Sequence, residues 1–104
     1  MIITNTPTVP GKEIIEVHGL ARGNTVRARN VGHDIFAGLK NIVGGEISEY
    51  TKLQADSREQ ALKRLEEDAI RIGANAVVNL RFTTTMVMQG CSEMLANGTA
   101  VTVK

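Results

Sequence analysis

The sequence predicts a single α+β domain, a two-layer β-α-β-β unit in which one long helix covers an antiparallel sheet. Two observations lead to this prediction. Apolar residues recur with helical spacing from about residue 48 to residue 72, and the stretches on either side are rich in β-branched residues. Because 104 residues correspond to one domain, we expect residues 1–104 to form a single unit.

The first elements are predicted to be two strands separated by a turn that contains both prolines. Residues 2–4 are β-rich, and Pro7 and Pro10 follow them. Because proline cannot donate to a strand ladder, residues 2–4 are predicted to form an edge strand that leads into a turn. Residues 14–22 are typical of a half-buried strand, and Gly23-Asn24 is predicted to form the next turn.

A short helix is expected before the long one. Residues 25–29 extend the preceding strand or form a loop, and Asp34 fits the N-cap position of a helix. The apolar residues that follow share one helical stripe, and Gly44-Gly45 ends it. The members of this stripe are Ile35, Phe36, Leu39, Ile42 and Val43.

The long helix is the strongest local prediction. Its outer face carries oppositely charged side chains four residues apart, such as Glu59 and Lys63, and Gly73 fits the residue that ends the helix. Asp56 and Glu59 also fit a capping box, which leaves open a break near Ala55.

Two strands are predicted after the helix, at residues 76–88 and 91–103, joined by a hairpin turn at Gln89-Gly90. Within the second strand, Asn97-Gly98 is either another turn or a bulge. The first strand alternates between two faces. Its apolar face holds Ala76, Val78, Leu80, Phe82, Thr84, Met86 and Met88, and its other face holds the polar residues Asn79, Arg81, Thr83 and Thr85.

Composition excludes several classes of protein. A formal net charge of +1, with charges of both signs interspersed, provides no basic stripe, so we expect no nucleic-acid partner. The apolar runs are too short to span a bilayer and no segment resembles a signal peptide, so we expect no membrane partner. The single cysteine, Cys91, cannot close an internal disulfide. These features predict a cytoplasmic protein.

Four segments, spread over nearly the whole chain, carry a family resemblance. They are Gly11-Lys12-Glu13-Ile14, the junction from Gly44-Gly45-Glu46 to Glu49-Tyr50-Thr51, Gly73-Ala74-Asn75-Ala76-Val77 and Gly98-Thr99-Ala100-Val101. Together they resemble the YbjQ-like family of bacterial heavy-metal-binding proteins. The resemblance implies a unit similar to a dodecin subunit, assembled into a ring-like homopentamer.

A metal site would require two or more ligands from His, Cys, Asp or Glu at bonding distance. The sequence has no Cys-x-x-Cys and no His-x-x-x-His, so the candidate metal ligands are His18 and Cys91, if their strands pair in a suitable register. A symmetric oligomer would repeat one residue, Glu16, His18 or Glu93, in every subunit and so form a ring of ligands. A transition metal ion is therefore the candidate cofactor.

Five further residues are candidates for binding a small ligand. If Glu93 lies across the hairpin from Arg81, the two form a cross-strand ion pair; otherwise Arg81 is available to bind an anion between subunits. Glu46, Glu49 and Tyr50 lie at the start of the long helix, where acidic groups are favoured by the helix dipole or form a carboxylate pair in a cleft.

We expect a homo-oligomeric binding protein rather than an enzyme. One helix covers only one face of the predicted sheet, which leaves a second face of mixed polarity for self-association. A pentamer that binds a small ligand or a metal ion at subunit junctions is the leading hypothesis. Two alternatives stay open: a small enzyme whose inter-subunit site is built from Glu46, Glu49, Tyr50 and Arg81, and a structural scaffold for a protein partner.

Overall fold

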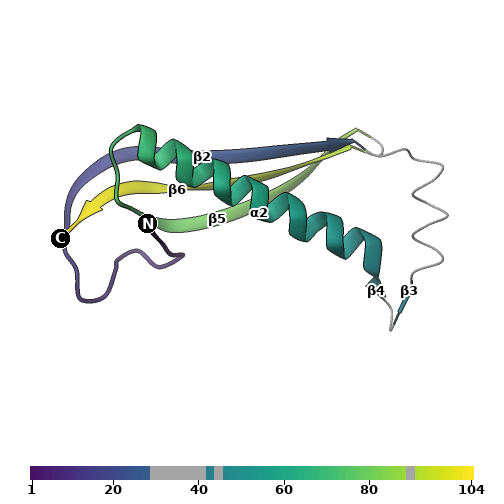
Figure 1. Ribbon diagram of the computed structural model, residues 1–104, viewed down its shortest axis with the longest axis horizontal. Coiled ribbons are helices and arrows are strands. Elements are labelled where there is room, and N and C mark those ends of the chain that lie inside the picture. Colours follow the sequence, from purple (N-terminus) through teal and green to yellow (C-terminus); the bar gives the residue numbers. More distant parts are fainter. Residues whose placement is uncertain (29–41, 44–45, 89–90) are drawn as a thin grey trace.

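The computed structural model describes residues 1–28, 42–43, 46–88 and 91–104. One long helix packs on one face of a four-stranded sheet, which confirms the predicted two-layer α+β architecture (Figure 1). The elements are β1 (Ile2–Ile3), β2 (Ile14–Ala28), β3 (Ile42–Val43), β4 (Glu46–Ile47), α2 (Ser48–Arg71), β5 (Ala76–Met88) and β6 (Cys91–Val103). No described helix is long and apolar enough to cross a membrane.

The sheet is mixed, with the strand order β1-β5-β6-β2. The two pairs β5–β6 and β2–β6 are antiparallel, as predicted, but β1 runs parallel to β5, so the prediction of a purely antiparallel sheet is wrong at this edge. A parallel pair requires a long crossover connection, and all of β2 and α2 lies between these two strands in the chain. The predicted edge strand at residues 2–4 is confirmed.

A bulge in β5 divides the strand into two halves. Val78 pairs with Thr99 and Arg81 pairs with Asn97, so Asn79 and Leu80 together face one residue, Gly98. Asn79 has a φ of 54°, in the left-handed region that asparagine tolerates better than most residues. The bulge therefore lies opposite Asn97-Gly98, and β6 passes through that dipeptide without a turn.

The bulge also changes which side chains share a face, and the predicted alternation of β5 is wrong beyond it. Leu80 packs against the core under the helix, together with Val77, whereas Val78 belongs to the cluster on the opposite face. Arg81 lies on the side of Val78, because the partners Asn97 and Thr99 are two residues apart on β6.

Small residues let the helix lie close to the sheet. The cluster under the helix consists of Ala21, Ala61, Leu65, Ala69, Ala74, Val77, Met94, Ala96 and Ala100. At Gly23, an added Cβ would meet backbone atoms of Ala61 and Leu65. Gly23 is therefore the place where the helix crosses β2, and the predicted turn at Gly23-Asn24 is wrong because β2 continues to Ala28.

The opposite face of the sheet has a smaller core near the chain ends. Val9, from the segment between β1 and β2, packs with Ala76, Val78, Val101 and Val103, and Ile14 packs against this group. Farther along β2 and β5 this face has no covering element among the described residues, and Leu20 and Val26 are exposed there. A second face of mixed polarity was predicted, and this region has that character.

The helix is continuous from Ser48 to Arg71, so no break occurs near Ala55. Its end follows the prediction: Gly73 has a φ of 91°, its N–H donates to the Ile70 carbonyl at 3.0 Å, and the Ala74 N–H donates to the Ala69 carbonyl at 3.0 Å. This is a Schellman motif, in which glycine takes the left-handed position without a steric cost.

The short helix predicted after Asp34 falls mainly on residues 35–41, which are outside the described residues. Its last two apolar members, Ile42 and Val43, form β3 rather than a helical turn, because they pair with Ile47 and Glu46 of β4. The predicted stop at Gly44-Gly45 thus lies between two paired strands, and those two glycines are also outside the described residues.

Candidate functional site

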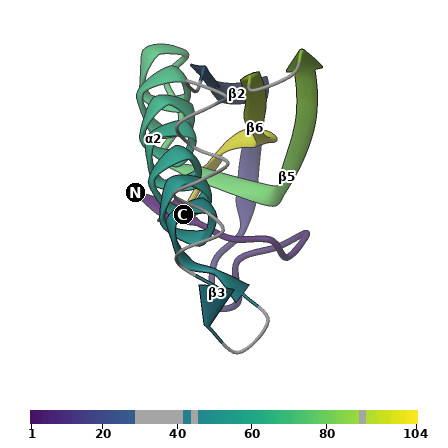
Figure 2. The same cartoon turned by 90° about the vertical axis from the view of Figure 1, so that its right-hand side faces the viewer.

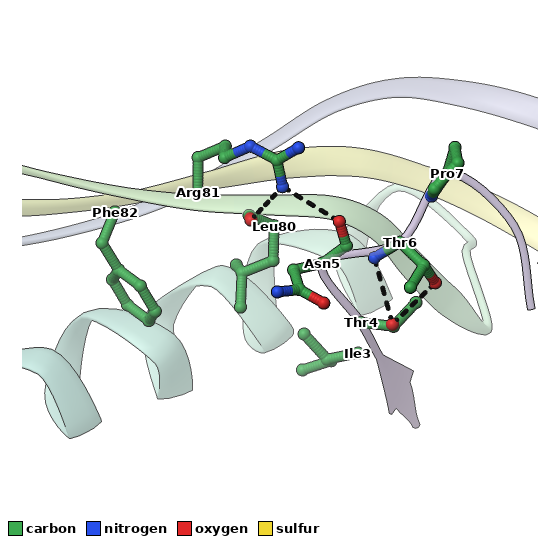
Figure 3. A pocket seen from close by; sticks show the side chains of 8 residues that line it. All are labelled: Ile3, Thr4, Asn5, Thr6, Pro7, Leu80, Arg81 and Phe82. Carbon is green, nitrogen blue, oxygen red and sulfur yellow. Dashed lines mark hydrogen bonds between the residues drawn. The ribbon is translucent and has the colours of Figure 1, made fainter.

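An open pocket lies between the segment that follows β1 and the bulged part of β5 (Figure 3). Its volume is about 790 Å³, and it is lined by Ile3, Thr4, Asn5, Thr6, Pro7, Leu80, Arg81 and Phe82. Ile3, Leu80 and Phe82 supply an apolar wall, with the Arg81 guanidinium on the other side of β5 (Figure 3). The pocket therefore has an apolar wall on one side of the β5 edge and a cation on the other.

The bulge positions both sides of this pocket. It turns two backbone amides outward: the Asn79 N–H donates to the Thr6 carbonyl at 2.9 Å, and the Leu80 N–H donates to the Thr4 carbonyl at 3.0 Å. These bonds tie the segment after β1 to the edge of β5. The same bulge places Arg81 next to that segment, so the pocket results from a single irregularity in the strand.

Arg81 is partly engaged within the protein. Its Nη1 donates to the Asn5 carbonyl at 3.0 Å and to the Leu80 carbonyl at 2.8 Å. A guanidinium has five N–H groups, and the described residues place no acceptor on Nε or Nη2. These remaining donors lie on an exposed side chain, in the arrangement that pairs with a carboxylate or phosphate through two parallel hydrogen bonds.

The threonine hydroxyls of the pocket bind one another rather than the open space. Thr4 Oγ1 and Thr6 Oγ1 lie 2.9 Å apart, and Thr6 Oγ1 donates to the Thr8 carbonyl at 2.6 Å. They hold the shape of the segment after β1. The sequence predicted a turn here, but it did not identify the segment as part of a site, because hydrogen bonds from threonine side chains to nearby residues leave only a weak signal in a sequence.

The condition for an ion pair between Arg81 and Glu93, that they face each other across the hairpin, is not met. Arg81 pairs with Asn97 and Glu93 pairs with Thr85, so the two charged residues lie four positions apart along β6, about 13 Å. Glu93 instead accepts a hydrogen bond from the Asn24 side-chain amide at 3.1 Å. Arg81 is therefore free of a carboxylate partner among the described residues.

The two predicted metal ligands lie at opposite ends of the ladder between β2 and β6. His18 is next to Gly19, which pairs with Ala100, whereas Cys91 pairs with Ala28. Ten residues of β2 separate these positions, about 33 Å, so His18 and Cys91 cannot share an ion within one chain. The described residues hold no group of three His, Cys, Asp or Glu side chains that could bind a metal ion.

His18 has two polar neighbours at its own end of the sheet. Its Nε2 lies 2.6 Å from Thr102 Oγ1 and 3.9 Å from Glu16 Oε2, and its ring is beside Gly73 at the end of α2. The imidazole and the Glu16 carboxylate are two ligands that a divalent transition metal accepts. One chain supplies this pair, and Cys91 has a different close partner, Met88, across the hairpin.

Glu46, Glu49 and Tyr50 lie at the far end of the molecule from the pocket. Glu46 is in β4, and the other two are in the first turn of α2. Ala61 of the helix lies over Gly23, in line across the sheet with Phe82, the residue after Arg81. Glu49 comes twelve residues before Ala61, about 18 Å along the helix axis. Arg81 also faces away from the helix. These four residues do not converge within one chain, so a shared site would require a second copy.

The outer edge of β2 is covered by side chains from the helix, which sequence reasoning did not anticipate. The Arg22 N–H donates to Asp68 Oδ2 at 3.1 Å, and Arg64 Nη1 donates to the Asn24 carbonyl at 2.6 Å. Arg71 binds Asp68 Oδ1 through Nη2 at 2.8 Å. The hydrogen bond from Arg71 and that from the Arg22 amide lower the pKa of Asp68 below its usual value.

The outer edge of β5 is open by comparison. β1 pairs with β5 only at Ala76 and Val77, and beyond Leu80 no described strand lies beside it. Figure 2 shows α2 over β2 and β6, with β5 on the far side. Phe82, Met86 and Met88 of this part of β5 are all exposed. Unpaired backbone and apolar side chains thus occur together at this edge.

Comparisons with known proteins agree over the whole chain. The YbjQ family model, described as "Putative heavy-metal-binding", matches residues 1–104. A "UPF0145 protein" of Archaeoglobus fulgidus is 57% identical over 104 residues, covering 100% of this chain and 96% of that protein. A "UPF0145 protein" of Dehalococcoides mccartyi is 54% identical over 104 residues, covering 100% of both chains. Since the relatives include archaeal proteins, the expectation of a bacterial family is too narrow.

A solved structure shows the same fold. The crystal structure of a DUF74-family protein from Pediococcus pentosaceus has a TM-score of 0.66 to this chain and 15% sequence identity, and the match covers 100% of this chain and 98% of that one. At this identity the likeness concerns the fold alone.

Proposed function

Because this chain belongs to the YbjQ family, we propose that it is a subunit of a ring-like homo-oligomer, a pentamer, that binds a small ligand or a metal ion at the junctions between subunits. The role proposed is binding rather than catalysis. The observation that supports it most is the Arg81 pocket, which opens beside the unpaired edge of β5.

The contrast between the two edges of the sheet supports self-association at β5. Unpaired N–H and C=O groups of an edge strand readily pair with another chain unless side chains cover them. On β2, Arg64 and Asp68 cover the edge, whereas residues 81–88 of β5 have no such cover among the described residues. A second copy seated at β5 would bury Phe82 and Met86, which are 39% and 76% exposed in one chain.

The ligand that suits the pocket is a small carboxylate or phosphate with an apolar body. The free donors of Arg81 would hold the anionic group through two hydrogen bonds on one side of β5, and the apolar body would reach around the open edge of the strand to Ile3, Leu80 and Phe82 on its other side. A neighbouring subunit at β5 would close the open side of the pocket. Closure excludes water and strengthens the charged hydrogen bonds, so binding and assembly would support each other.

Native mass spectrometry of protein purified without chelators tests the assembly. The expected species is a pentamer, and a monomer at micromolar concentration would overturn the proposal. Ligand binding is tested separately by NMR titration with benzoate, isovalerate and inorganic phosphate. Arg81→Gln is expected to abolish the NMR chemical-shift changes that these ligands cause. Arg81→Lys is expected to weaken binding, because lysine lacks the fork of donors. Arg58→Gln, an exposed change on the helix, serves as the matched control.

A metal ion is the second candidate ligand, and the pair of His18 and Glu16 favours it. Each subunit would supply two ligands for a divalent ion such as zinc, and a neighbour would supply the rest. His18→Ala and Glu16→Gln are each expected to remove bound zinc, measured by elemental analysis of the oligomer, with Glu13→Gln as the control. Unchanged zinc content in His18→Ala protein would refute this candidate.

A further inference from the structure

Two arginines and an asparagine form one row across the face of the sheet that the helix does not cover. Arg22 of β2 pairs with Asn97 of β6, and Asn97 pairs in turn with Arg81 of β5. Residues that lie directly opposite each other in an antiparallel pair project to the same face. Neighbouring strands are about 4.8 Å apart, so the Cα atoms of Arg22 and Arg81 are separated by about 10 Å.

The residues next to this row show which face it occupies. Ala21 and Ala96, one residue earlier on β2 and β6, belong to the core under the helix. Because successive residues of a strand point to opposite faces, Arg22 and Asn97 face away from the helix. The Arg81 guanidinium also lies on the side of β5 away from the helix (Figure 3). All three side chains therefore share the uncovered face.

The polar groups of Arg22 and Asn97 have no partner in the part of the chain that the structure describes. Arg22 is joined to Asp68 through its backbone N–H, and Asp68 is already held by the Arg71 guanidinium. The hydrogen bonds from Arg71 and from the Arg22 amide do most to lower the pKa of Asp68, and the charge of the Arg22 side chain adds the smallest contribution. The Arg22 guanidinium and the Asn97 side-chain amide thus keep their donors for another molecule.

The rows on either side of this one are uncharged. One row consists of Leu20, Thr99 and Val78, and the other consists of Asn24, Leu95 and Thr83. The acidic residue of β6 on this face is Glu93, four residues from Asn97 and about 13 Å away, and it already accepts a hydrogen bond from Asn24. Two positive charges therefore face solvent about 10 Å apart, with a neutral amide donor between them.

The spacing of these charges determines which ligand suits them. One carboxylate or phosphate pairs with one guanidinium through two parallel hydrogen bonds. A ligand with a single anionic group at Arg81 leaves Arg22 without a partner, whereas a second anionic group on the same molecule pairs with it. Between the two groups, the Asn97 amide can donate to either one.

We infer that Arg22 and Arg81, with Asn97 between them, bind a small molecule that carries two anionic groups, carboxylates or phosphates. The inference rests on the anion-binding role proposed for Arg81 and adds a second class of ligand at that residue. Such a ligand extends over β6 toward Arg22, not around the edge of β5, and needs no apolar body.

The test is calorimetric titration of the full chain at constant ionic strength. One arm compares succinate, glutarate and adipate with isovalerate, and the other compares pyrophosphate with inorganic phosphate. In at least one arm, the ligand with two anionic groups should bind at least about tenfold more tightly, equivalent to about 1.4 kcal/mol. That arm identifies the anionic groups. Arg22→Gln should remove this preference, and Arg22→Lys should keep only part of it, because lysine lacks the fork of donors.

Arg58→Gln is the matched control, because it makes the same change in net charge at an exposed position of the helix. The inference is overturned if neither arm shows a preference, if Arg22→Gln retains it, or if Arg58→Gln loses it to the same extent. If isovalerate binds at Arg81 and no preference is found, only this inference falls. If isovalerate does not bind while a dianion binds through both arginines, the ligand with an apolar body fails and this inference stands.

Discussion

Replacing Gly98 by alanine should destabilise the fold, chiefly through a contact with Val77. The added Cβ would lie 2.5 Å from Val77 Cγ1 and 3.0 Å from the Val78 carbonyl oxygen, where carbon atoms normally stay about 3.5–4.0 Å apart. Val77 is fully buried in the core under the helix, so its methyl group cannot turn away without moving its neighbours. Overpacking of this kind costs about 1–3 kcal/mol.

Part of this cost is offset in the unfolded state. Alanine restricts the unfolded chain more than glycine does, which stabilises the fold by about 0.4–1 kcal/mol where the native backbone accepts alanine. We therefore expect Gly98→Ala to lower the free energy of unfolding by about 1–2 kcal/mol. Urea unfolding followed by circular dichroism measures this change, at equal protein concentrations because the proposed assembly would contribute to apparent stability.

A double-mutant cycle identifies the contact responsible. Val77→Ala removes the obstructing methyl group, so Gly98→Ala should cost at least about 0.5 kcal/mol less in that background than alone. If the cost is the same in both backgrounds, the clash with Val77 is not its cause. If Gly98→Ala alone leaves stability unchanged, then β6 is more mobile opposite the bulge than its geometry indicates.

Three further outcomes are expected. Asp68→Asn should flatten the acid side of the stability–pH profile. The lowered pKa of Asp68 gives stability that is present above the unfolded-state pKa, about 3.9, and is lost as pH falls through the folded-state pKa. Acid unfolding of Asp68→Asn with the same slope as the parent would contradict this. Gly73→Ala, at a φ of 91°, should lower the free energy of unfolding by about 1–2 kcal/mol in urea, since the left-handed position penalises a Cβ. Met86→Lys should shift the protein toward the monomer in sedimentation velocity, whereas Arg58→Gln should not; equal oligomer content in both variants would place the interface away from β5.

Much of the fold could be predicted from local patterns. The long helix was predicted from its repeated apolar and charged positions, and its end from Gly73, because both signals lie within a few turns of the chain. The two C-terminal strands were predicted with their observed bounds. Such features depend on neighbours in sequence, which is why a single sequence contains them.

The errors come from contacts between distant residues. Gly23 has the appearance of a turn residue, but it is small because Ala61 and Leu65 of the helix pass over it. The bulge at Asn79 shifts the register by one residue, and the pattern of apolar and polar residues in β5 does not indicate a bulge there. Whether Arg81 and Glu93 face each other could not be decided from the sequence for a related reason, because the hairpin register determines which residues lie opposite.

The candidate site was predicted only in part. Arg81 was identified from its place on the polar face of a strand, and it does line the pocket. The opposite wall, from Thr4 to Pro7, was not identified, because a segment far away in the chain forms it. His18 and Cys91 were candidates for one metal site only in a suitable strand register, and the observed register separates them.

The unequal edges of the sheet restrict the symmetry that an assembly can have. Two open β5 edges that paired with each other would form a twofold dimer and leave no further edge for a third copy. A closed ring of five needs each subunit to present two different surfaces, one that seats the β5 edge and one that is seated. Since Arg64 and Asp68 cover the edge of β2, the second surface is better sought on the uncovered sheet face around Leu20 and Val26. The helix side chains that cover the edge of β2 would then determine which surface of each subunit receives the β5 edge of its neighbour in the ring.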